Sequence, residues 1–293
     1  MPETRGIDHI VHCVRDLDVA VARFAALGFT LTPRALHPFG TGNALVQLQG
    51  NFIELLAIVE PAKIGAAAAG GFSFGAFCRD ALERREGMAM LVFESRDARA
   101  DHGDFERAGL DAYPVFDFAR KATLPDGAEA EVAFSLAFVT HPRMPQAAFF
   151  TCQQHAPEYF WKPEYQRHAN GARTIAEIVM VAERPADWRG FLEGLQGVGS
   201  VGDADGGLAV RTNRGRVSVL DETAFAARFP GETAPIEREG PVFAAAVVSV
   251  ADLDVLRERL AASDSDVGKS ADGRPFVRAA DAFGLVLGFA PAG

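Results

Sequence analysis

Hydrophobic and polar residues alternate at the start of the chain and then change to a helical period. Residues 7–14 alternate in the manner of a strand, which places Ile7 and His9 on one face. Asp16 is suited to cap the N-terminus of a helix that Gly28 ends. Three apolar segments follow, at residues 29–33, 43–49 and 52–59. The pattern therefore predicts a βαβββ module.

The same pattern recurs along the chain. A shift of 81 residues places Asp97 on Asp16, and a shift of 236 residues places Asp252 on Asp16. Residues 174–220 hold a further copy, the most diverged of the set. We therefore predict an α+β fold of four βαβββ modules, paired so that each pair forms a half-barrel lobe.

These repeats divide the chain into three regions. Residues 1–155 would form a first lobe from modules 1 and 2, and residues 174–293 a second, diverged lobe from modules 3 and 4. The connector between them, residues 156–173, is rich in aromatic residues, which predicts that it packs over the fold. Pairing of the modules within one chain, or between two chains, stays open at this stage.

The composition is that of a globular protein, with 48% hydrophobic and 23% charged residues. The net charge of −10, without a basic block, argues against nucleic acid or an anionic membrane and favours a small neutral or cationic ligand. No run reaches the ~18 apolar residues of a membrane span, and residues 1–5 lack a signal peptide's apolar core, so we expect a cytoplasmic protein. The three cysteines are far apart and predict no disulfide framework.

Three short motifs look like known sites but lack the required context. Residues 71–75 spell G-x-S-x-G after an Ala/Gly-rich stretch, and residues 197–202 spell G-x-G-x-x-G after a helix rather than a strand. We interpret both as loop segments. His9 and His12 have an odd separation, which sends them to opposite faces of a strand, so they cannot chelate one ion together.

Two polar residues stand among apolar neighbours in the first module. His9 lies on the opening strand, where Ile7 and Val11 are expected to share its face. Glu54 lies within the apolar closing strand FIELLAI. A carboxylate buried without a partner costs several kcal/mol, so Glu54 should be ion-paired, hydrogen-bonded or bound to a metal. A satisfied His–Glu pair without metal is the alternative.

Several segments together carry a family resemblance. They are residues 8–29, the loop at residues 37–43, the strand Phe52–Leu56, the turn at residues 125–127 and the strand Phe149–Cys152. With them, the chain resembles the vicinal oxygen chelate superfamily, and specifically its glyoxalase-like domain proteins. The resemblance implies the glyoxalase/bleomycin-resistance/dioxygenase-like fold. It covers residues 6–155 and extends to the rest of the chain through the repeat.

The resemblance also implies a site for a divalent metal (zinc, manganese, iron or nickel) in the paired-module cleft, with ligands from the first and fourth strands of each module. His9 and Glu54 match these strands, and Glu54 would also be catalytic. The second module departs from the pattern, because Met90 falls where a histidine would stand and Cys152 is matched to the acidic position. Cys152 is therefore the third metal-ligand candidate.

Further residues near the cleft could bind or transform the substrate. His155, or Gln154 beside it, could complete the site just beyond the last strand of the second module, with His155 moving a proton. A loop at the mouth of the cleft and the aromatic connector supply the substrate-binding candidates. These are His37, Phe39, Asn43, Trp161 and His168, for which local turn contacts are the alternative.

The second lobe is expected to be a poor metal site. Glu177 falls at the position of His9 in the third module but has no acidic partner, and Ala245 and Leu285 occupy the two positions in the fourth. This lobe would complete the scaffold, form a ligand cleft or form a homodimer face.

Three functions follow, in order of support. The first is a metal-dependent lyase or isomerase that acts on a small carbonyl or vicinal-oxygen substrate. The second is a non-catalytic protein that binds a small molecule of the antibiotic type, with no metal. The third, an extradiol-type dioxygenase, has the least support because the second half lacks a ligand set.

Overall fold

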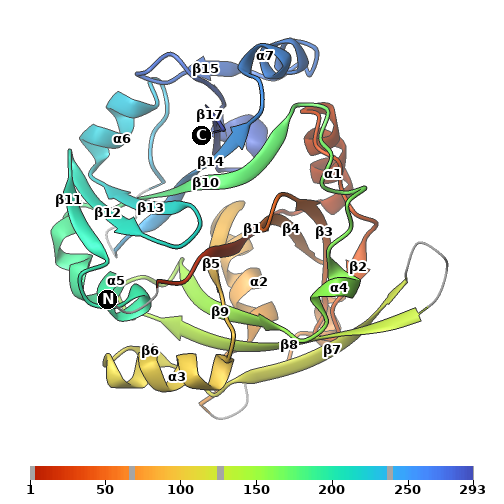
Figure 1. Ribbon diagram of the computed structural model, residues 1–293, viewed down its shortest axis with the longest axis vertical. Coiled ribbons are helices and arrows are strands. Elements are labelled where there is room, and N and C mark those ends of the chain that lie inside the picture. Colours follow the sequence, from red (N-terminus) through yellow and green to blue (C-terminus); the bar gives the residue numbers. More distant parts are fainter. Residues whose placement is uncertain (1–3, 66–69, 124–128, 236–239, 293) are drawn as a thin grey trace.

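The computed structural model describes residues 4–65, 70–123, 129–235 and 240–292. The turn motif at residues 125–127 lies outside them. Within these ranges the strands form two separate sheets (Figure 1).

The first sheet has the strand order β2-β3-β4-β1-β5-β9-β8-β6, and β7 pairs with β8. Its strands are β1 (Ile7–Cys13), β2 (Ala35–Leu36), β3 (Thr41–Gln47), β4 (Phe52–Ile58), β5 (Gly87–Glu94), β6 (Asp111–Ala112), β7 (Phe116–Thr123), β8 (Glu129–Thr140) and β9 (Ala148–Gln154). Strand β7 is an addition to the predicted module.

The second sheet has the order β11-β12-β13-β10-β14-β17-β16-β15. Its strands are β10 (Ala172–Val181), β11 (Val201–Ala204), β12 (Gly207–Arg211), β13 (Arg216–Leu220), β14 (Val242–Val250), β15 (Val267–Lys269), β16 (Pro275–Val277) and β17 (Val286–Pro291). The two orders correspond strand for strand, apart from β7, which confirms four βαβββ modules in two lobes.

Each module carries one helix after its opening strand. These helices are α1 (Leu17–Ala26), α3 (Ala98–Arg107), α5 (Arg189–Gln196) and α7 (Leu253–Ala261). Asp16, Asp97 and Asp252 accept backbone N–H groups at the starts of α1, α3 and α7, as an N-cap requires. The predicted repeat of Asp16 is thus a repeat of helix caps.

The remaining helices lie in the connections. They are η1 (Pro61–Lys63), α2 (Phe74–Arg84), α4 (Pro157–Phe160), η2 (Pro185–Trp188), α6 (Glu222–Arg228) and η3 (Ala279–Ala282). Ser73, from the G-x-S-x-G motif, caps α2 by accepting the N–H of Ala76. In the described part of the chain, no helix combines the length and apolar character needed to cross a bilayer.

The modules pair through their opening strands within one chain. Strand β1 lies antiparallel to β5, with Ile10 opposite Leu91. Strand β10 lies antiparallel to β14 in the same way. Module 1 therefore pairs with module 2, and module 3 with module 4, which answers the question that the sequence left open.

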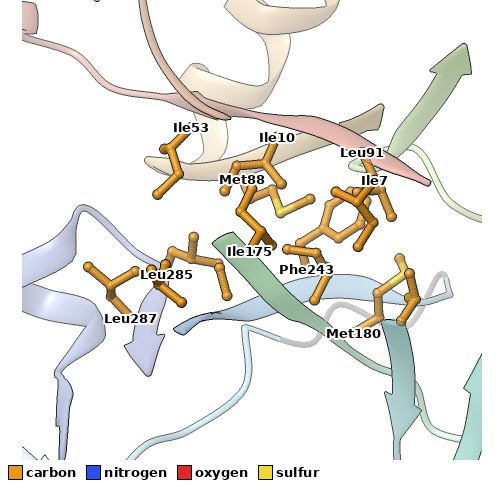
Figure 2. Close-up of a cluster of buried hydrophobic side chains, with 14 of the residues drawn as sticks. Ile7, Ile10, Ile53, Met88, Leu91, Ile175, Met180, Phe243, Leu285 and Leu287 are labelled. Carbon is orange, nitrogen blue, oxygen red and sulfur yellow. The ribbon is translucent and has the colours of Figure 1, made fainter. Parts of the chain in front are cut away.

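The two sheets pack back to back across a shared core. Figure 2 shows Ile10 and Leu91 of the first sheet facing Ile175 and Phe243 of the second. Every residue of β1 and of β14 is buried, so these strands are covered on both faces. The opposite face of each sheet supports a separate apolar cluster, one per lobe.

A bulge near the start of β1 changes which residues share a face. The pairing with β5 shifts between Ile7 and His9, so Ile7 turns into the shared core with Ile10. The expectation that Ile7 lies on the same face as His9 is therefore wrong. His12 lies against Phe24, on the opposite face from His9, as its odd spacing predicted.

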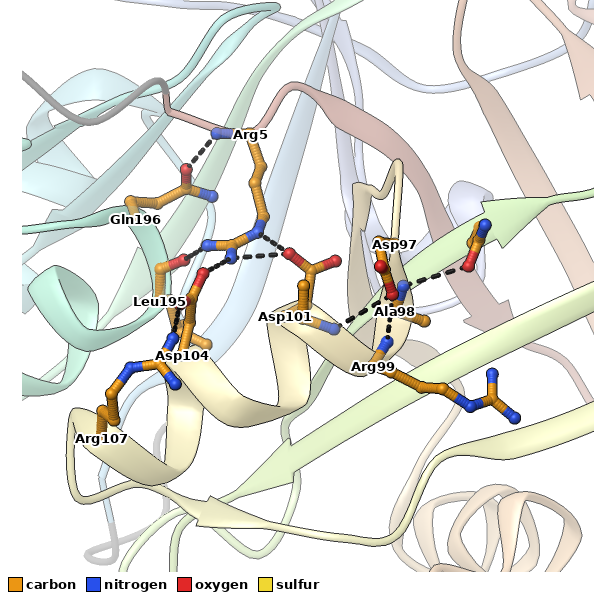
Figure 3. Close-up of polar contacts among 11 residues, drawn as sticks. Arg5, Asp97, Ala98, Arg99, Asp101, Asp104, Arg107, Leu195 and Gln196 are labelled. Carbon is orange, nitrogen blue, oxygen red and sulfur yellow. Dashed lines mark hydrogen bonds and ion pairs between the residues drawn. The ribbon is translucent and has the colours of Figure 1, made fainter.

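Polar contacts of the N-terminal segment also join the lobes. Arg5 donates to Asp101 of α3 at 2.7 and 2.9 Å and to the carbonyl of Leu195 in α5 at 2.8 Å (Figure 3). Its backbone N–H donates to Gln196 Oε1 at 2.9 Å. A single arginine thus ties a helix of module 2 to a helix of module 3.

The shared core predicts that the lobes unfold together. Phe243 is fully buried between the sheets, so Phe243→Ala should lower the free energy of unfolding by about 3–5 kcal/mol. The chain has two tryptophans, Trp161 against the first-lobe cluster and Trp188 in the shared core. In each of the variants Trp161→Phe and Trp188→Phe, urea unfolding followed by the remaining tryptophan's fluorescence should coincide with unfolding followed by far-UV circular dichroism. Separate midpoints would contradict a single cooperative unit.

Candidate functional site

The first lobe encloses a cavity of about 50 Å³ on the face of its sheet that points away from the shared core. A single water needs roughly 10–15 Å³, so this space admits a small group of atoms rather than a large ligand. Most of its lining is aromatic or aliphatic. The lining residues are His9, His37, Phe39, Asn43, Leu45, Phe52, Glu54, Phe74, Phe118, Arg120, Phe134, Leu136, Phe150, Cys152 and Phe160.

Glu54 is the buried carboxylate of this cavity, with 5% of its surface exposed. Asn43 Nδ2 donates to its Oε1 at 2.5 Å. His37 Nε2 lies 3.8 Å from Oε1, and His9 Nε2 lies 3.9 Å from Oε2. The predicted partners of Glu54 therefore exist, but they leave Oε2 without a hydrogen bond from the described residues.

His9 is held in one orientation by groups behind it. Its Nδ1 lies 2.6 Å from Asp8 Oδ2, and Gln154 Nε2 donates to Asp8 Oδ1 at 3.1 Å. The ring of Phe52 stacks on the imidazole at 4.1 Å between centroids. Because Asp8 holds the Nδ1 side of the ring, Nε2 faces the cavity and Glu54.

His37 is held from the hairpin between β2 and β3. Its Nδ1 lies 2.7 Å from Thr41 Oγ1, and the Phe39 ring stacks on it at 5.0 Å. Burial lowers the pKa of His37 to about 4, although the nearby charge of Glu54 opposes this shift. The imidazole is therefore neutral at neutral pH and can present a lone pair to the cavity.

A larger hollow of about 470 Å³ adjoins the cavity, and we call it the vestibule. Asn43, Leu45, Arg120 and Phe160 line both spaces, so they form the boundary between them. The vestibule is also lined by Tyr159 and other residues of the connector and of the β2–β3 hairpin. A ligand can therefore place a small group beside Glu54 and its larger part in the vestibule.

The structure gathers most of the site residues that the sequence predicted. His9, His37, Phe39, Asn43, Glu54 and Cys152 all line the cavity. Burial raises the pKa of the Cys152 thiol, and the charges of Asp8 and Glu54 add to the effect. Cys152 therefore stays a thiol, which is a weak metal ligand.

The other three predicted residues lie outside the cavity lining. His155 is exposed, and its Nε2 lies 2.8 Å from Ser135 Oγ, which donates to Asp117. Trp161 packs behind the lining, with its ring 5.8 Å from that of Phe52.

His168 supports the backbone. It accepts the N–H of Thr30 at 3.0 Å through Nδ1, and its Nε2 lies 2.8 Å from the carbonyl of Gln47. Burial lowers its pKa, although the hydrogen bond with Gln47 opposes this. Both partners are distant in the sequence, so His168 ties the connector to the first module and its contacts are not those of a local turn.

Strand register corrects two of the predicted correspondences. In the first module Val11 lies opposite Glu54. Its counterpart Val92 lies opposite Phe150, so Phe150 occupies the position of Glu54 and Cys152 is two residues further along. In the fourth module, Val247 lies opposite Gly288 rather than Leu285, which packs in the shared core.

Sequence reasoning missed Asp8 and Arg120. Asp8 was assigned to the face opposite His9, but the bulge in β1 brings both to the site. Arg120 lies on β7, which was not predicted. The alternation of Phe116, Phe118 and Arg120 against polar or small residues was the available signal for this strand.

The second lobe uses the equivalent positions differently. Glu177, at the position of His9, is buried and accepts two hydrogen bonds from Arg228, one from Arg216 and one from Ser218. Burial alone would raise its pKa, but these hydrogen bonds lower it to about 2. In neither lobe do three or more described His, Cys, Asp or Glu residues form a ready metal cluster.

A family model described as "Glyoxalase-like domain" matches residues 7–195, more than half of the chain. The chain belongs to the glyoxalase-like domain family. This membership confirms the resemblance to the vicinal oxygen chelate superfamily. No curated protein matches the sequence.

Solved structures share the fold of this glyoxalase-like protein at low sequence identity. A hypothetical protein from Staphylococcus aureus has a TM-score of 0.65 and 12% identity, covering 98% of this chain and 99% of its own. A mutant of 4-hydroxymandelate synthase from Streptomyces coelicolor has a TM-score of 0.59 and 11% identity, covering 99% and 94%. The Mn(II)-bound glyoxalase from Novosphingobium aromaticivorans has 0.58 and 13%, covering 99% and 82%.

The Glu177 network predicts a pH dependence of stability. Because its pKa is lowered from 4.5 to about 2, the ionised carboxylate stabilises the fold above about pH 4.5 and loses this effect as pH falls towards 2. The stability difference between wild type and Glu177→Gln should therefore shrink by about 3 kcal/mol over that interval. Urea unfolding at several pH values measures it, with Glu183→Gln, an exposed site, as control. A constant difference would contradict the assignment.

Proposed function

We propose that this glyoxalase-like protein is a lyase or isomerase that acts on a small carbonyl or vicinal-oxygen substrate in the first lobe. One observation carries the proposal: a buried carboxylate, Glu54, is flanked by the Nε2 atoms of His9 and His37 in a cavity that is otherwise mostly apolar. Such an arrangement places a carboxylate base and two imidazole nitrogens around one small space.

Glu54 is the group that would move a proton. Asn43 holds its Oε1 at 2.5 Å, and its Oε2 is free to accept a proton from the carbon beside a substrate carbonyl. The aromatic lining excludes water and so strengthens the charge interactions of Glu54 with a bound group. His9 is fixed by Asp8, so its Nε2 can orient a substrate oxygen or coordinate an ion.

The residue types at this site suit a divalent transition metal. His9, His37 and Glu54 offer two imidazoles and a carboxylate, and Asp8 orients His9 as a carboxylate behind a ligand histidine does. Two ligands bound at about 2.0–2.2 Å to one tetrahedral ion lie roughly 3.3–3.6 Å apart. The observed 3.8 and 3.9 Å would therefore have to close by a few tenths of an ångström.

When bound there, the metal would polarise a carbonyl oxygen as a Lewis acid. His9 and Glu54 would hold it, with His37 beside them. A Mn(II)-bound glyoxalase among the proteins of similar fold supports this choice. The first module carries the entire donor set, because the second module contributes Met90 and Phe150 at the matching positions.

A second candidate function is ligand binding without chemistry. Met90 and Phe150 leave the second module without a hard ligand, and the cavity is lined largely by phenylalanine. A protein of this kind would sequester a small molecule without metal. The second lobe does not support an extradiol-type dioxygenase, because both carboxylate oxygens of Glu177 already accept hydrogen bonds from Arg228.

Metal analysis tests the first part of the proposal. Protein purified without chelators, or titrated with Mn, Fe, Zn or Ni, should hold about one ion per chain. Inductively coupled plasma mass spectrometry and calorimetric titration measure this. Glu54→Gln and His9→Ala should abolish binding, whereas His155→Gln, outside the cavity, should retain it. Absence of metal under all these conditions would reject the metal-dependent form.

Proton exchange tests the second part. 2-Hydroxyacetophenone carries two vicinal oxygens and a phenyl group, so its head suits the cavity and its ring the vestibule. In D₂O the protein, with any metal it requires, should speed loss of the methylene proton signal, followed by NMR. Glu54→Gln should slow this at least about 100-fold, because general-base catalysis contributes that much. His155→Gln serves as the control, and binding without exchange would favour the sequestering function.

A further inference from the structure

Arg120 lies at the boundary between the cavity and the vestibule. It stands on β7 opposite Val132 of β8, and its side chain is half-buried. It lines both spaces. Among the residues that the structure describes, the guanidinium of Arg120 has neither a hydrogen-bond partner nor an ion-pair partner.

Other partly buried arginines of the chain do have partners. Arg228 forms two hydrogen bonds with Glu177, and Arg5 forms two with Asp101. Glu54 is the acidic residue that lines the cavity together with Arg120, but the charged atoms of the two side chains do not approach within 4.0 Å. Taking a guanidinium out of water without a partner is costly, so its N–H groups are available to a ligand.

Three more basic residues line the vestibule, and none of its described lining residues is acidic. Arg34, Lys121 and Lys162 line it together with Arg120. The protein as a whole has a net charge of −10. A positive hollow in an acidic protein favours an anionic ligand. Tyr159 and Tyr165 in the same lining supply aromatic surface for its body.

We propose that Arg120 binds a carboxylate of the substrate, so that the substrate is a small organic acid whose body lies in the vestibule. This inference rests on the proposed function of the first-lobe site. A planar guanidinium pairs with a carboxylate through two parallel hydrogen bonds. The negative charge of Glu54 repels the same group, which keeps the carboxylate at the boundary and directs the neutral carbonyl end inward.

The competing role for Arg120 is to balance the charge of Glu54. In that case its removal would affect charged and neutral ligands alike. A carboxylate anchor would instead discriminate between an acid and its amide of the same shape. The comparison of phenylacetate with phenylacetamide separates the two roles.

Calorimetric titration of these two ligands tests the proposal. Wild type should bind phenylacetate at least tenfold more tightly than phenylacetamide. Arg120→Gln should weaken phenylacetate binding at least tenfold and change phenylacetamide binding less than twofold. Arg120→Lys should fall between, because it keeps the charge but loses the two parallel hydrogen bonds.

Arg34→Gln is the matched control, because Arg34 lines the vestibule but is already ion-paired with Asp18. Its effect should be small and should vanish at about 0.5 M salt, whereas that of Arg120→Gln should persist. Thermal unfolding adds a readout for Arg120→Gln. Removing an unpartnered guanidinium should leave the melting temperature unchanged or raise it, whereas a structural role would lower it.

Equal affinity of wild type for the acid and the amide would overturn the inference, even if Arg120→Gln did not fold. Equal weakening of both ligands by Arg120→Gln would also overturn it and leave charge balance as the role. In either case phenylacetamide binding and Glu54-dependent proton exchange would still support the proposed function. Failure of wild type to bind either ligand would overturn the inference, and loss of exchange as well would reject the proposed function.

Discussion

Back-to-back packing of the two sheets is the constraint on which the site depends. Each opening strand must bury one face in the shared core, so only its other face can serve a ligand. The bulge near the start of β1 changes locally which residues lie on the ligand-facing side. It turns Ile7 to the core beside Ile10, and it leaves His9 at the cavity with Asp8 behind it, where Asp8 orients His9.

The same bulge occurs in β10 between Ile175 and Glu177, so it belongs to the module rather than to the chemistry of one lobe. What differs is how each buried position is satisfied. In the second lobe, Arg216 and Arg228 neutralise Glu177 and close the position. In the first lobe, the equivalent residue is His9, which faces a cavity where Glu54 keeps Oε2 without a hydrogen bond from the described residues. One backbone frame thus supports a structural ion pair in one lobe and an open site in the other.

Local patterns in the sequence were sufficient for the modules, the helix caps and a buried Glu54 with a polar partner. They were insufficient where tertiary pairing decides. The bulge that moves Ile7 depends on pairing with β5, and the register that places Phe150 rather than Cys152 at the acidic position depends on pairing of β5 with β9. Arg120 was missed because it lies on β7, which pairs with β8 and is outside the repeated module.

Whole-chain charge was also a poor guide to the ligand. A net charge of −10 favoured a neutral or cationic small molecule. The charged residues that line the vestibule are nevertheless all positive. Glu54 and Arg120 line one cavity without forming an ion pair, although pairing would satisfy both. A fold that keeps two opposite charges apart inside an apolar lining gives up stability there. Such local inconsistency is expected where a ligand completes the interactions that the chain leaves open.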